Sequence, residues 1–411
     1  MPSDSHTLAP VKIAINHLKP GMYVLSITSK KSSVSIKSEG YINTEDSINK
    51  LKRSGIVSVT IDPSRDKNNK QVDSEVPEDA CLSAEDDEAE YDTGPNVSFE
   101  KEMKTASKLY EDAKGLQRKI LTAITKNKEI DMDAVQESTD AIVDSIFRNQ
   151  DALSCMSRLR IKDEYLVEHS LNVSILMTIF AKHLKMEREI IEQLALGAFL
   201  HDIGKIKVPS EVLNKPGRLT DEEFEIIKGH VMLGVAVLKE TDGFPENVLD
   251  MVQDHHERLN GKGYPNQISA DDLGIHSRMI AIVDSYDAMT AERVYKSGMN
   301  PITAFKNLIN DSPYGYDEEL VEQFVACLGV YPVGTLVKLN SGKLGIISKL
   351  NKNKPLQPFV RVFYNTRLNQ AIAMEEIDLS QAKANDHIDC CIKEEDYNIN
   401  LLAFFKMAFD C

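Results

Sequence analysis

The sequence has no long hydrophobic run, no closely paired cysteines and no excess of basic residues. No apolar stretch approaches the ~18 residues that a membrane-spanning helix needs, and the first residues, MPSDSHTLAPVK, lack the basic-then-apolar pattern of a secretory signal. The six cysteines form no CxxC pair, and the adjacent Cys390 and Cys391 are poorly placed to bridge each other. These absences favour a cytoplasmic protein with reduced thiols.

The acidic charge is concentrated in one segment. A formal net charge of −16 argues against a general nucleic-acid binder, because phosphate backbones are held by clustered Lys and Arg. Residues 73–92 contain ten Asp or Glu and no Lys or Arg, and so contribute −10 of that charge. Such a segment buries too little apolar surface to offset its ordering entropy, so residues 66–99 are predicted to be an acidic disordered linker. A partner-binding acidic segment is the alternative.

The N-terminal part, residues 1–65, is predicted to be a small α+β domain, to which the resemblance given below assigns a regulatory role. Two strands flank a turn at Pro20 and Gly21, and a short helix from about Glu45, ended by Gly55, precedes a further strand. The histidines of this region stand alone in the sequence, so we expect no catalysis here.

The middle of the chain is predicted to be helical and the end β-rich. Residues 98–328 repeat apolar positions with a period near 3.6, which predicts a helical region; we divide it into a connector over 100–150 and a domain over 151–328, the part that carries the family resemblance given below. Thr220 and Glu223 form a T-x-x-E capping box that predicts a helix start. The stretches at 334–340, 344–350 and 358–365 predict strands, so residues 329–411 are expected to form a small β-rich unit with a terminal helix.

Histidines and aspartates interrupt the apolar faces of the helical region. Five of the ten histidines are predicted to face inward, namely His169, His201, His230, His255 and His256. His255 and His256 continue the apolar stripe of Val248, Met251 and Val252, and His230 follows Ile226 and Ile227. Asp202 ends an apolar run, and Asp284 and Asp287 lie inside another.

A shared cation would explain this pattern. Burying several imidazoles and carboxylates without compensation costs several kcal/mol each. Inward His and carboxylates on packed helices are a known way to build dimetal sites. A set of five imidazoles with carboxylates and no thiolate favours Fe, Mn or Zn over calcium or a closed structural zinc site, and it exceeds what one octahedral ion can use. Two ions would support in-line displacement at phosphorus, which makes phosphoester hydrolysis the predicted reaction class.

Five segments together resemble the HD-GYP domain, whose members are cyclic di-GMP phosphodiesterases of bacterial signalling. They are YLVEHS at 165–170, HDIGK at 201–205, His230, HHERLNGKGYP at 255–265 and DSYDAMTAERVYK at 284–296. The resemblance covers roughly residues 150–328, and residues 11 to about 65 are similar to a small domain often found before HD-GYP domains. The expected fold class is therefore a multidomain protein with a mainly α-helical HD-type catalytic domain around an inward-facing dimetal site.

The resemblance implies a role for each ligand. His169, His201, Asp202 and Asp284 would hold one divalent ion, and His230, His255 and His256 the other, with Asp202 bridging the two. Fe or Mn is the expected metal, with Zn, Ni and Co as further candidates. Some family members have a third-metal Glu where this sequence has Tyr165, so a two-metal site is expected.

The remaining site residues are expected to act on the substrate. The resemblance implies that Lys205 donates to the scissile phosphate and that Arg293 and Lys296 grip the phosphates or a guanine. Val294 stands where the family commonly has Pro, so the backbone that carries Lys296 is expected to be less fixed. Tyr264 would line the substrate cleft or present a surface to partner proteins. Asp287 would orient a ligand or accept a proton, or make only a helix-terminal hydrogen bond.

Three functions are consistent with these residues. The leading hypothesis is hydrolysis of cyclic di-GMP to linear pGpG and onward to GMP, in which water acidified by the two ions attacks phosphorus in line with the departing oxygen. A phosphodiesterase acting on 3′,3′-cyclic GMP-AMP by the same mechanism is the first alternative. A non-catalytic module that binds the dinucleotide and signals through protein contacts is the second, and the full ligand set argues against it. A homodimer and GYP-loop partners are compatible with either.

Overall fold

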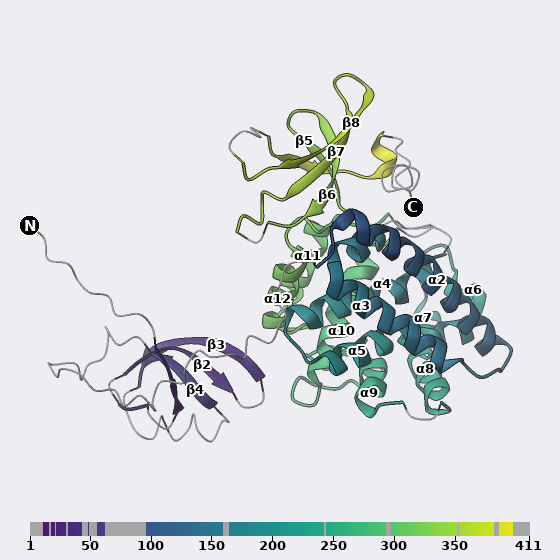
Figure 1. Cartoon of the computed structure of the whole chain (residues 1–411). Coiled ribbons are helices and arrows are strands. Elements are labelled where there is room, and N and C mark those ends of the chain that lie inside the picture. The colour runs from purple at the N-terminus through teal and green to yellow at the C-terminus, as the bar shows by residue number, and fades with distance from the viewer. Residues whose placement is uncertain are drawn as a thin grey trace, which may run out of the picture. The chain divides into compact units, whose positions relative to one another are not determined.

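The computed structural model describes two compact units, Met1–Asp92 and Thr93–Cys411 (Figure 1). The described residues are 11–15, 18–20, 22–29, 32–42, 48, 56–61, 96–158, 164–241, 244–292, 297–351, 353–381 and 386–397. The helix expected from about Glu45 falls outside these ranges except for Ile48, and the acidic linker expected over 66–99 falls outside them up to residue 95.

The N-terminal unit contains an antiparallel sheet with the strand order β1-β4-β2-β3. Its strands are β1 (Val11–Ala14), β2 (Tyr23–Ser29), β3 (Ser32–Tyr41) and β4 (Ile56–Ile61). Ile13, Val24 and Val59 are buried in its small core. Strand β3 was not predicted, because its residues, SSVSIKSEGY, carry a weak apolar signal and depend on pairing with β2.

The second unit is mainly helical, as predicted for residues 98–328. Its helices are α2 (Phe99–Thr125), α3 (Met132–Met156), α4 (Tyr165–His183), α5 (Arg188–Leu200), η5 (Ile203–Lys207), α6 (Ser210–Leu213), α7 (Asp221–Lys228), α8 (His230–Lys239), α9 (Glu246–Asp254), α10 (Ile275–Thr290), α11 (Pro301–Asp311) and α12 (Glu318–Leu328). Every residue from Val167 to Ala181 of α4 is buried, because α2, α3, α5, α10 and α12 pack around it. A helix enclosed in this way can be apolar on all sides.

Helix α2 is tied to α4 by polar side chains inside the core. The Lys114 ammonium is 1% exposed and lies 3.0 Å from Glu168 Oε1 and 2.8 Å from Glu164 Oε2. The Tyr110 hydroxyl donates to Asn172 Oδ1 over 2.9 Å. Helices α2 and α3 therefore share one core with the helices that follow them, although residues 100–150 were predicted as a connector.

The C-terminal β-rich unit is a five-stranded antiparallel sheet with the order β8-β7-β6-β5-β9. The strands β5 (Leu336–Leu339), β6 (Lys343–Lys349) and β7 (Phe359–Asn365) match the three predicted stretches. Strands β8 (Gln370–Asp378) and β9 (Ile388–Cys391) were not predicted, because both are largely exposed and carry little apolar alternation. The expected terminal helix lies beyond Tyr397, outside the described residues.

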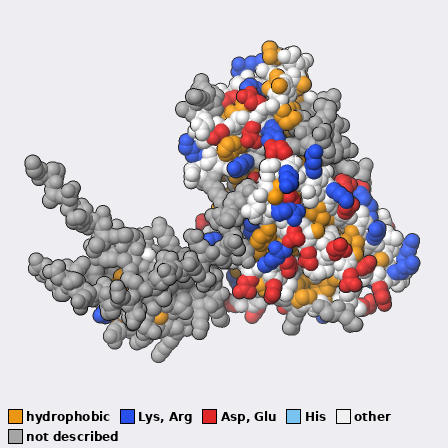
Figure 2. Space-filling model, viewed as in Figure 1, with side chains coloured by type: hydrophobic (Ala, Val, Ile, Leu, Met, Phe, Trp, Pro, Cys, Tyr) orange, Lys and Arg blue, Asp and Glu red, His pale blue; other side chains and the backbone are white. Residues whose placement is uncertain are grey.

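The surface of the helical unit mixes both signs of charge. Figure 2 shows acidic and basic side chains intermingled over this unit, with hydrophobic side chains between them. Among the residues that the structure describes, no helix is long and apolar enough to cross a membrane.

Candidate metal centre

The predicted ligands lie at the ends of several helices that meet in the core. His169 is in the second turn of α4, His201 and Asp202 directly follow α5, His230 begins α8, the pair at 255 and 256 directly follows α9, and Asp284 is inside α10. A helix end can direct a side chain along its axis into a space that neighbouring helices enclose. Segments distant in sequence thus converge on one point.

The exposure of Ile226, on α7, differs from the expectation. The capping box of Thr220 and Glu223 is confirmed and begins α7. Gly229 lies between α7 and α8. Ile226 is 44% exposed although it was placed on an inward face, because α7 lies at the surface and has no buried residue, whereas His230 is fully buried.

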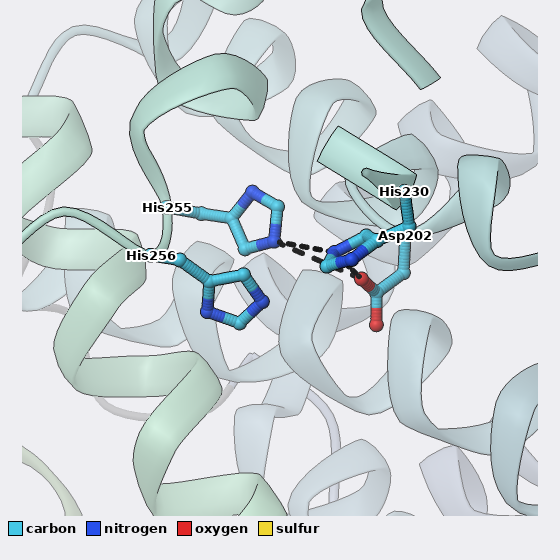
Figure 3. A group of neighbouring side chains, drawn as sticks. All are labelled: Asp202, His230, His255 and His256. Carbon is cyan, nitrogen blue, oxygen red and sulfur yellow. Dashed lines mark hydrogen bonds and ion pairs between the residues drawn. The ribbon is translucent and has the colours of Figure 1, made fainter. Parts of the chain in front are cut away.

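The seven predicted ligands form two adjoining groups. One contains Asp202, His230, His255 and His256, and the other contains His169, His201 and Asp284; within each group the potential ligand atoms lie within 4.8 Å of one another. Figure 3 shows His255 and His256 on one side of the first group, with His230 and Asp202 facing them.

Asp202 faces both groups with different oxygens. Its Oδ1 lies 3.2 Å from His230 Nε2 and 3.7 Å from His255 Nε2. Its Oδ2 lies 3.3 Å from His169 Nε2 and 3.4 Å from His201 Nε2. Asp284 completes the second group, with its Oδ1 2.9 Å from His169 Nε2. Each carboxylate oxygen of Asp202 can therefore serve a separate ion.

The histidine tautomers are set by hydrogen bonds behind the rings. Nδ1 of His201, His230 and His255 donates to the backbone carbonyl three residues earlier, over 2.7, 2.7 and 2.6 Å. Nδ1 of His169 donates to Asp287 Oδ2 over 2.7 Å. With Nδ1 protonated in this way, Nε2 carries the lone pair and points into the group, which is the arrangement that metal-binding histidines commonly have.

The inward atoms fit a cation better than they fit one another. His169 Nε2, His201 Nε2 and Asp202 Oδ1 are buried and have no hydrogen-bond partner of acceptable geometry among the described residues. Buried polar atoms are normally satisfied, and leaving each of them unpaired costs ~1–3 kcal/mol. A divalent cation would satisfy all three, so the buried His and Asp cluster is suited to binding divalent metal.

The electrostatics keep both carboxylates and two of the imidazoles in metal-binding protonation states. Burial raises the pKa of both carboxylates. Lys205 and His201 outweigh it at Asp202, and His169 and His256 outweigh it at Asp284, so both pKa values are held well below the usual range. Burial lowers the pKa of His201, and burial together with the neighbouring His201 lowers that of His255 to about 3. Ionised carboxylates and neutral imidazoles are the forms that bind metals.

The predicted substrate-binding residues are placed only in part. Lys205 forms an ion pair with Asp202 Oδ2, and its side chain is 15% exposed. Tyr264 lies beside the first group, with ring centroids 4.6 Å from His256. Asp287 is fully buried behind His169, where it orients that ring. Arg293 and Lys296 fall outside the described residues.

Glu257 organises the loop after the two histidines and was not predicted to do so. This carboxylate is fully buried and accepts hydrogen bonds from the backbone N–H groups of Asn266 and Ile268 over 2.7 and 3.2 Å. Gly263 packs against the backbone of Glu257 so closely that a Cβ there would overlap it. The adjacency of Glu257 to the two histidines was the only signal in the sequence, and a Glu in a charged dipeptide normally indicates a solvated turn.

Family models match three parts of the chain: an HD domain over residues 154–320, a domain of unknown function over residues 11–135, and a KOW domain associated with HD domains over residues 336–399. A cyclic di-GMP phosphodiesterase of Pseudomonas aeruginosa is 31% identical over 383 residues, which cover 92% of this chain and 91% of the relative.

Two further relatives match part of the chain. A cyclic di-GMP phosphodiesterase of Thermotoga maritima is 33% identical over 183 residues, covering 44% of this chain and 49% of the relative. A 3′3′-cGAMP-specific phosphodiesterase of Vibrio cholerae is 36% identical over 124 residues, covering 30% of this chain and 24% of the relative.

Proposed function

This chain belongs to the HD-GYP family of HD-domain phosphodiesterases, and on that basis we propose that it hydrolyses cyclic di-GMP to linear pGpG. The relative from Pseudomonas aeruginosa, which aligns over nearly the whole length of both chains, carries that activity in its name. The observation that supports the proposal best is the position of Asp202, whose two oxygens face two separate groups of buried imidazoles.

The proposed centre holds two divalent ions. His169, His201 and Asp284 would bind one, His230, His255 and His256 the other, and Asp202 both. When bound, such a pair supplies Lewis acidity toward a phosphate oxygen and lowers the pKa of water. Iron or manganese suits a set of imidazoles and carboxylates without thiolate, and Zn, Ni and Co are the alternatives for metal analysis to distinguish. The Tyr165 ring stacks on His169 with centroids 5.2 Å apart, and it offers no carboxylate for a third ion where some family members have Glu.

The other residues position the substrate and stabilise charge. Burial lowers the pKa of Lys205, but Asp202 outweighs it and raises that pKa above its usual value, so the ammonium stays charged beside the centre. A fixed cation there stabilises charge that gathers on phosphoryl oxygens during attack. Asp287 keeps His169 oriented, and Tyr264 borders the space beside His256. Arg293 and Lys296 remain proposed phosphate or guanine contacts.

A second candidate substrate is 3′,3′-cyclic GMP-AMP. The similarity to a cGAMP-specific phosphodiesterase over part of the chain favours testing it beside cyclic di-GMP. The same metal chemistry would serve both, because the scissile phosphodiester is alike and only one base differs. Further cleavage of pGpG to GMP, a cytoplasmic location, a homodimer and protein partners at the GYP loop belong to the same proposal.

The proposal is tested by assaying the full-length protein, purified without oxygen and loaded with Fe(II) or Mn(II), against both cyclic dinucleotides, with products resolved by chromatography. The double variant His201→Ala/Asp202→Ala should lose bound metal and turnover together. The matched control is Asp386→Ala/His387→Ala, which removes the same two residue types at the C-terminal sheet, where His387 is exposed, and should keep both. Absence of turnover by metal-loaded wild type would overturn the proposal.

A further inference from the structure

His256 is the most exposed of the seven predicted metal ligands. The side chains of His169, His201, His230 and His255 are at most 1% exposed, whereas that of His256 is 15% exposed. Lys205, at 15%, borders the same centre. A substrate phosphate must therefore approach past His256 and Lys205, and the parts of the substrate attached to it must lie against the neighbouring surface.

An aromatic and cationic surface lies next to His256. The Tyr264 ring lies beside the His256 ring. The Phe224 ring lies on from Tyr264, with the centroids of these two rings 6.1 Å apart and their planes at 83°. Phe224 is 43% exposed, so a ligand can reach its ring. The Lys228 ammonium lies 4.8 Å from the Phe224 centroid and 5.8 Å from that of Tyr264. We call Phe224, Lys228 and Tyr264 the aromatic shelf.

We propose that the aromatic shelf binds one guanine base of the cyclic dinucleotide, an inference that rests on the proposed function. Phe224 stacks on the base, as aromatic side chains do with unpaired bases. Lys228 donates a hydrogen bond to the O6 and N7 acceptors of guanine, an edge that Lys and Arg commonly read. The present partner of Lys228 is Glu225, which is 70% exposed, and such a surface ion pair is exchanged at little cost.

The shelf would also discriminate between bases. Guanine presents two acceptors to a lysine, whereas adenine presents an amino donor beside its N7. Lys228 therefore favours guanine at this position, and its removal should weaken that preference without touching the metal ligands. Such a base-reading group is the feature that the ligand motifs alone do not supply.

The first test uses the absence of tryptophan from the sequence. Phe224→Trp introduces a single indole on the shelf, and its fluorescence should fall when a hydrolysis-resistant phosphorothioate analogue of cyclic di-GMP binds to the metal-loaded protein. The matched control is Ile226→Trp, two residues away on α7 and similarly exposed at 44%, whose fluorescence should not change. If calorimetry shows that the analogue binds to the Phe224→Trp variant while the indole fluorescence does not change, the proposal that the aromatic shelf binds guanine is refuted.

The second test separates binding from chemistry. Phe224→Leu should raise KM for cyclic di-GMP roughly five- to 150-fold, the range expected for one lost base–aromatic stack, with kcat and bound metal little changed. Lys228→Met should reduce the preference for cyclic di-GMP over cyclic di-AMP in competition binding, Lys228→Arg should restore it, and Lys239→Met on the exposed surface of α8 should not alter it.

The outcomes distinguish the two proposals. If the wild-type protein neither binds nor hydrolyses a cyclic dinucleotide, the proposed function is refuted, and the proposal that the aromatic shelf binds guanine is refuted with it. If the wild-type protein hydrolyses cyclic di-GMP while the Phe224 and Lys228 variants match it in KM and base preference, only the shelf is refuted.

Discussion

At the scale of single residues, the histidines of the centre are oriented from behind in two ways. Those at 201, 230 and 255 use a carbonyl three residues earlier, a local bond that a helix end provides by itself. His169 instead uses Asp287, which is 118 residues away in sequence. The pattern of inward histidines was enough to predict that these side chains meet in the core, but the pairing of His169 with Asp287 depends on the packing of α4 against α10.

Asp287→Asn should weaken metal binding without removing a ligand. The amide can still accept from His169 Nδ1, but it lacks the negative charge that makes the imidazole a stronger donor. We expect a roughly 10- to 100-fold loss in metal affinity, measured by titrating metal into the apo protein, with an unchanged unfolding midpoint of that apo form. The exposed Asp272→Asn is the control. Unaltered affinity in Asp287→Asn would show that the carboxylate has no orienting role.

Two glycines should respond in opposite directions to the same substitution. A Cβ on Gly204 would overlap the carbonyl oxygen of His230 and the backbone of Gly234, so Gly204→Ala must push η5 away from α8. A Cβ on Gly115, inside α2, meets nothing within 4 Å. We expect Gly204→Ala to destabilise by ~1–3 kcal/mol and to lower metal content, and Gly115→Ala to stabilise by ~0.4–1 kcal/mol, both measured by urea unfolding. Equal effects would contradict the close packing of η5 on α8.

At the scale of elements, α2 shows what periodicity cannot reveal. A lysine in an amphipathic helix is normally a surface residue, yet Lys114 is buried because Glu168 on α4 and Glu164 at its start face it. Burial lowers the pKa of Lys114, but its hydrogen bonds to Glu164 and Glu168 outweigh burial and raise that pKa above its usual value. The ammonium is therefore charged at neutral pH, and its contribution to stability would be lost only as pH rises through that raised pKa.

Lys114→Met should accordingly destabilise the helical unit by ~3–5 kcal/mol at pH 7, because it leaves Glu168 charged and buried next to the proposed ligand His169. The control is Arg118→Met, one turn along α2, whose guanidinium is 45% exposed and pairs with the same Glu164. Arg118→Met should lower the free energy of unfolding by at most ~1 kcal/mol. Chemical unfolding of the metal-free proteins measures both, and similar values for the two variants would contradict the contrast between buried and exposed pairs.

Asp151, two residues after the kink of α3 at Asn149, predicts a pH effect on stability. Burial raises the pKa of its carboxyl from 3.8 to about 6, against the attraction of Lys349 and Lys182. The folded state thus holds this proton more tightly than the unfolded state, so wild-type stability falls as pH rises through about 4 to 6.

Asp151→Asn should remove this dependence. At pH 8 the variant should be more stable than wild type by up to ~3 kcal/mol, and near pH 4 the difference should vanish. Urea unfolding at several pH values measures the difference, with the exposed Asp112→Asn as the control. A difference that grows toward low pH would have the wrong sign for a buried carboxyl.

At the scale of the whole molecule, predictability followed the strength of the local pattern. The helical region, the β-rich C-terminal unit and the five motif segments carry strong periodicity or characteristic spacing. The sequences of strands β3, β8 and β9 lack such a pattern. Their polar residues form strands because neighbouring strands of the sheet pair with them. The exposure of Ile226 was mispredicted because the apolar residues of α7 indicate an inward face, whereas the structure buries no residue of this helix.

The two hydrophobic cores are separate, and this separation predicts where the activity lies. One core lies wholly within Thr93–Cys411 and includes residues of α2, α4, α10 and the C-terminal sheet, whereas the other contains only residues before Asp92. All seven proposed metal ligands belong to the larger unit.

We therefore expect a protein of residues 93–411 to fold, to bind as much metal as the full chain and to hydrolyse cyclic di-GMP with kcat/KM within about tenfold of it, a difference of ~1.4 kcal/mol. Metal analysis, thermal unfolding and the chromatographic assay compare the two proteins side by side. If the shortened protein folds and binds metal but loses turnover, the N-terminal unit contributes to catalysis itself; if it fails to fold, the two cores are not independent.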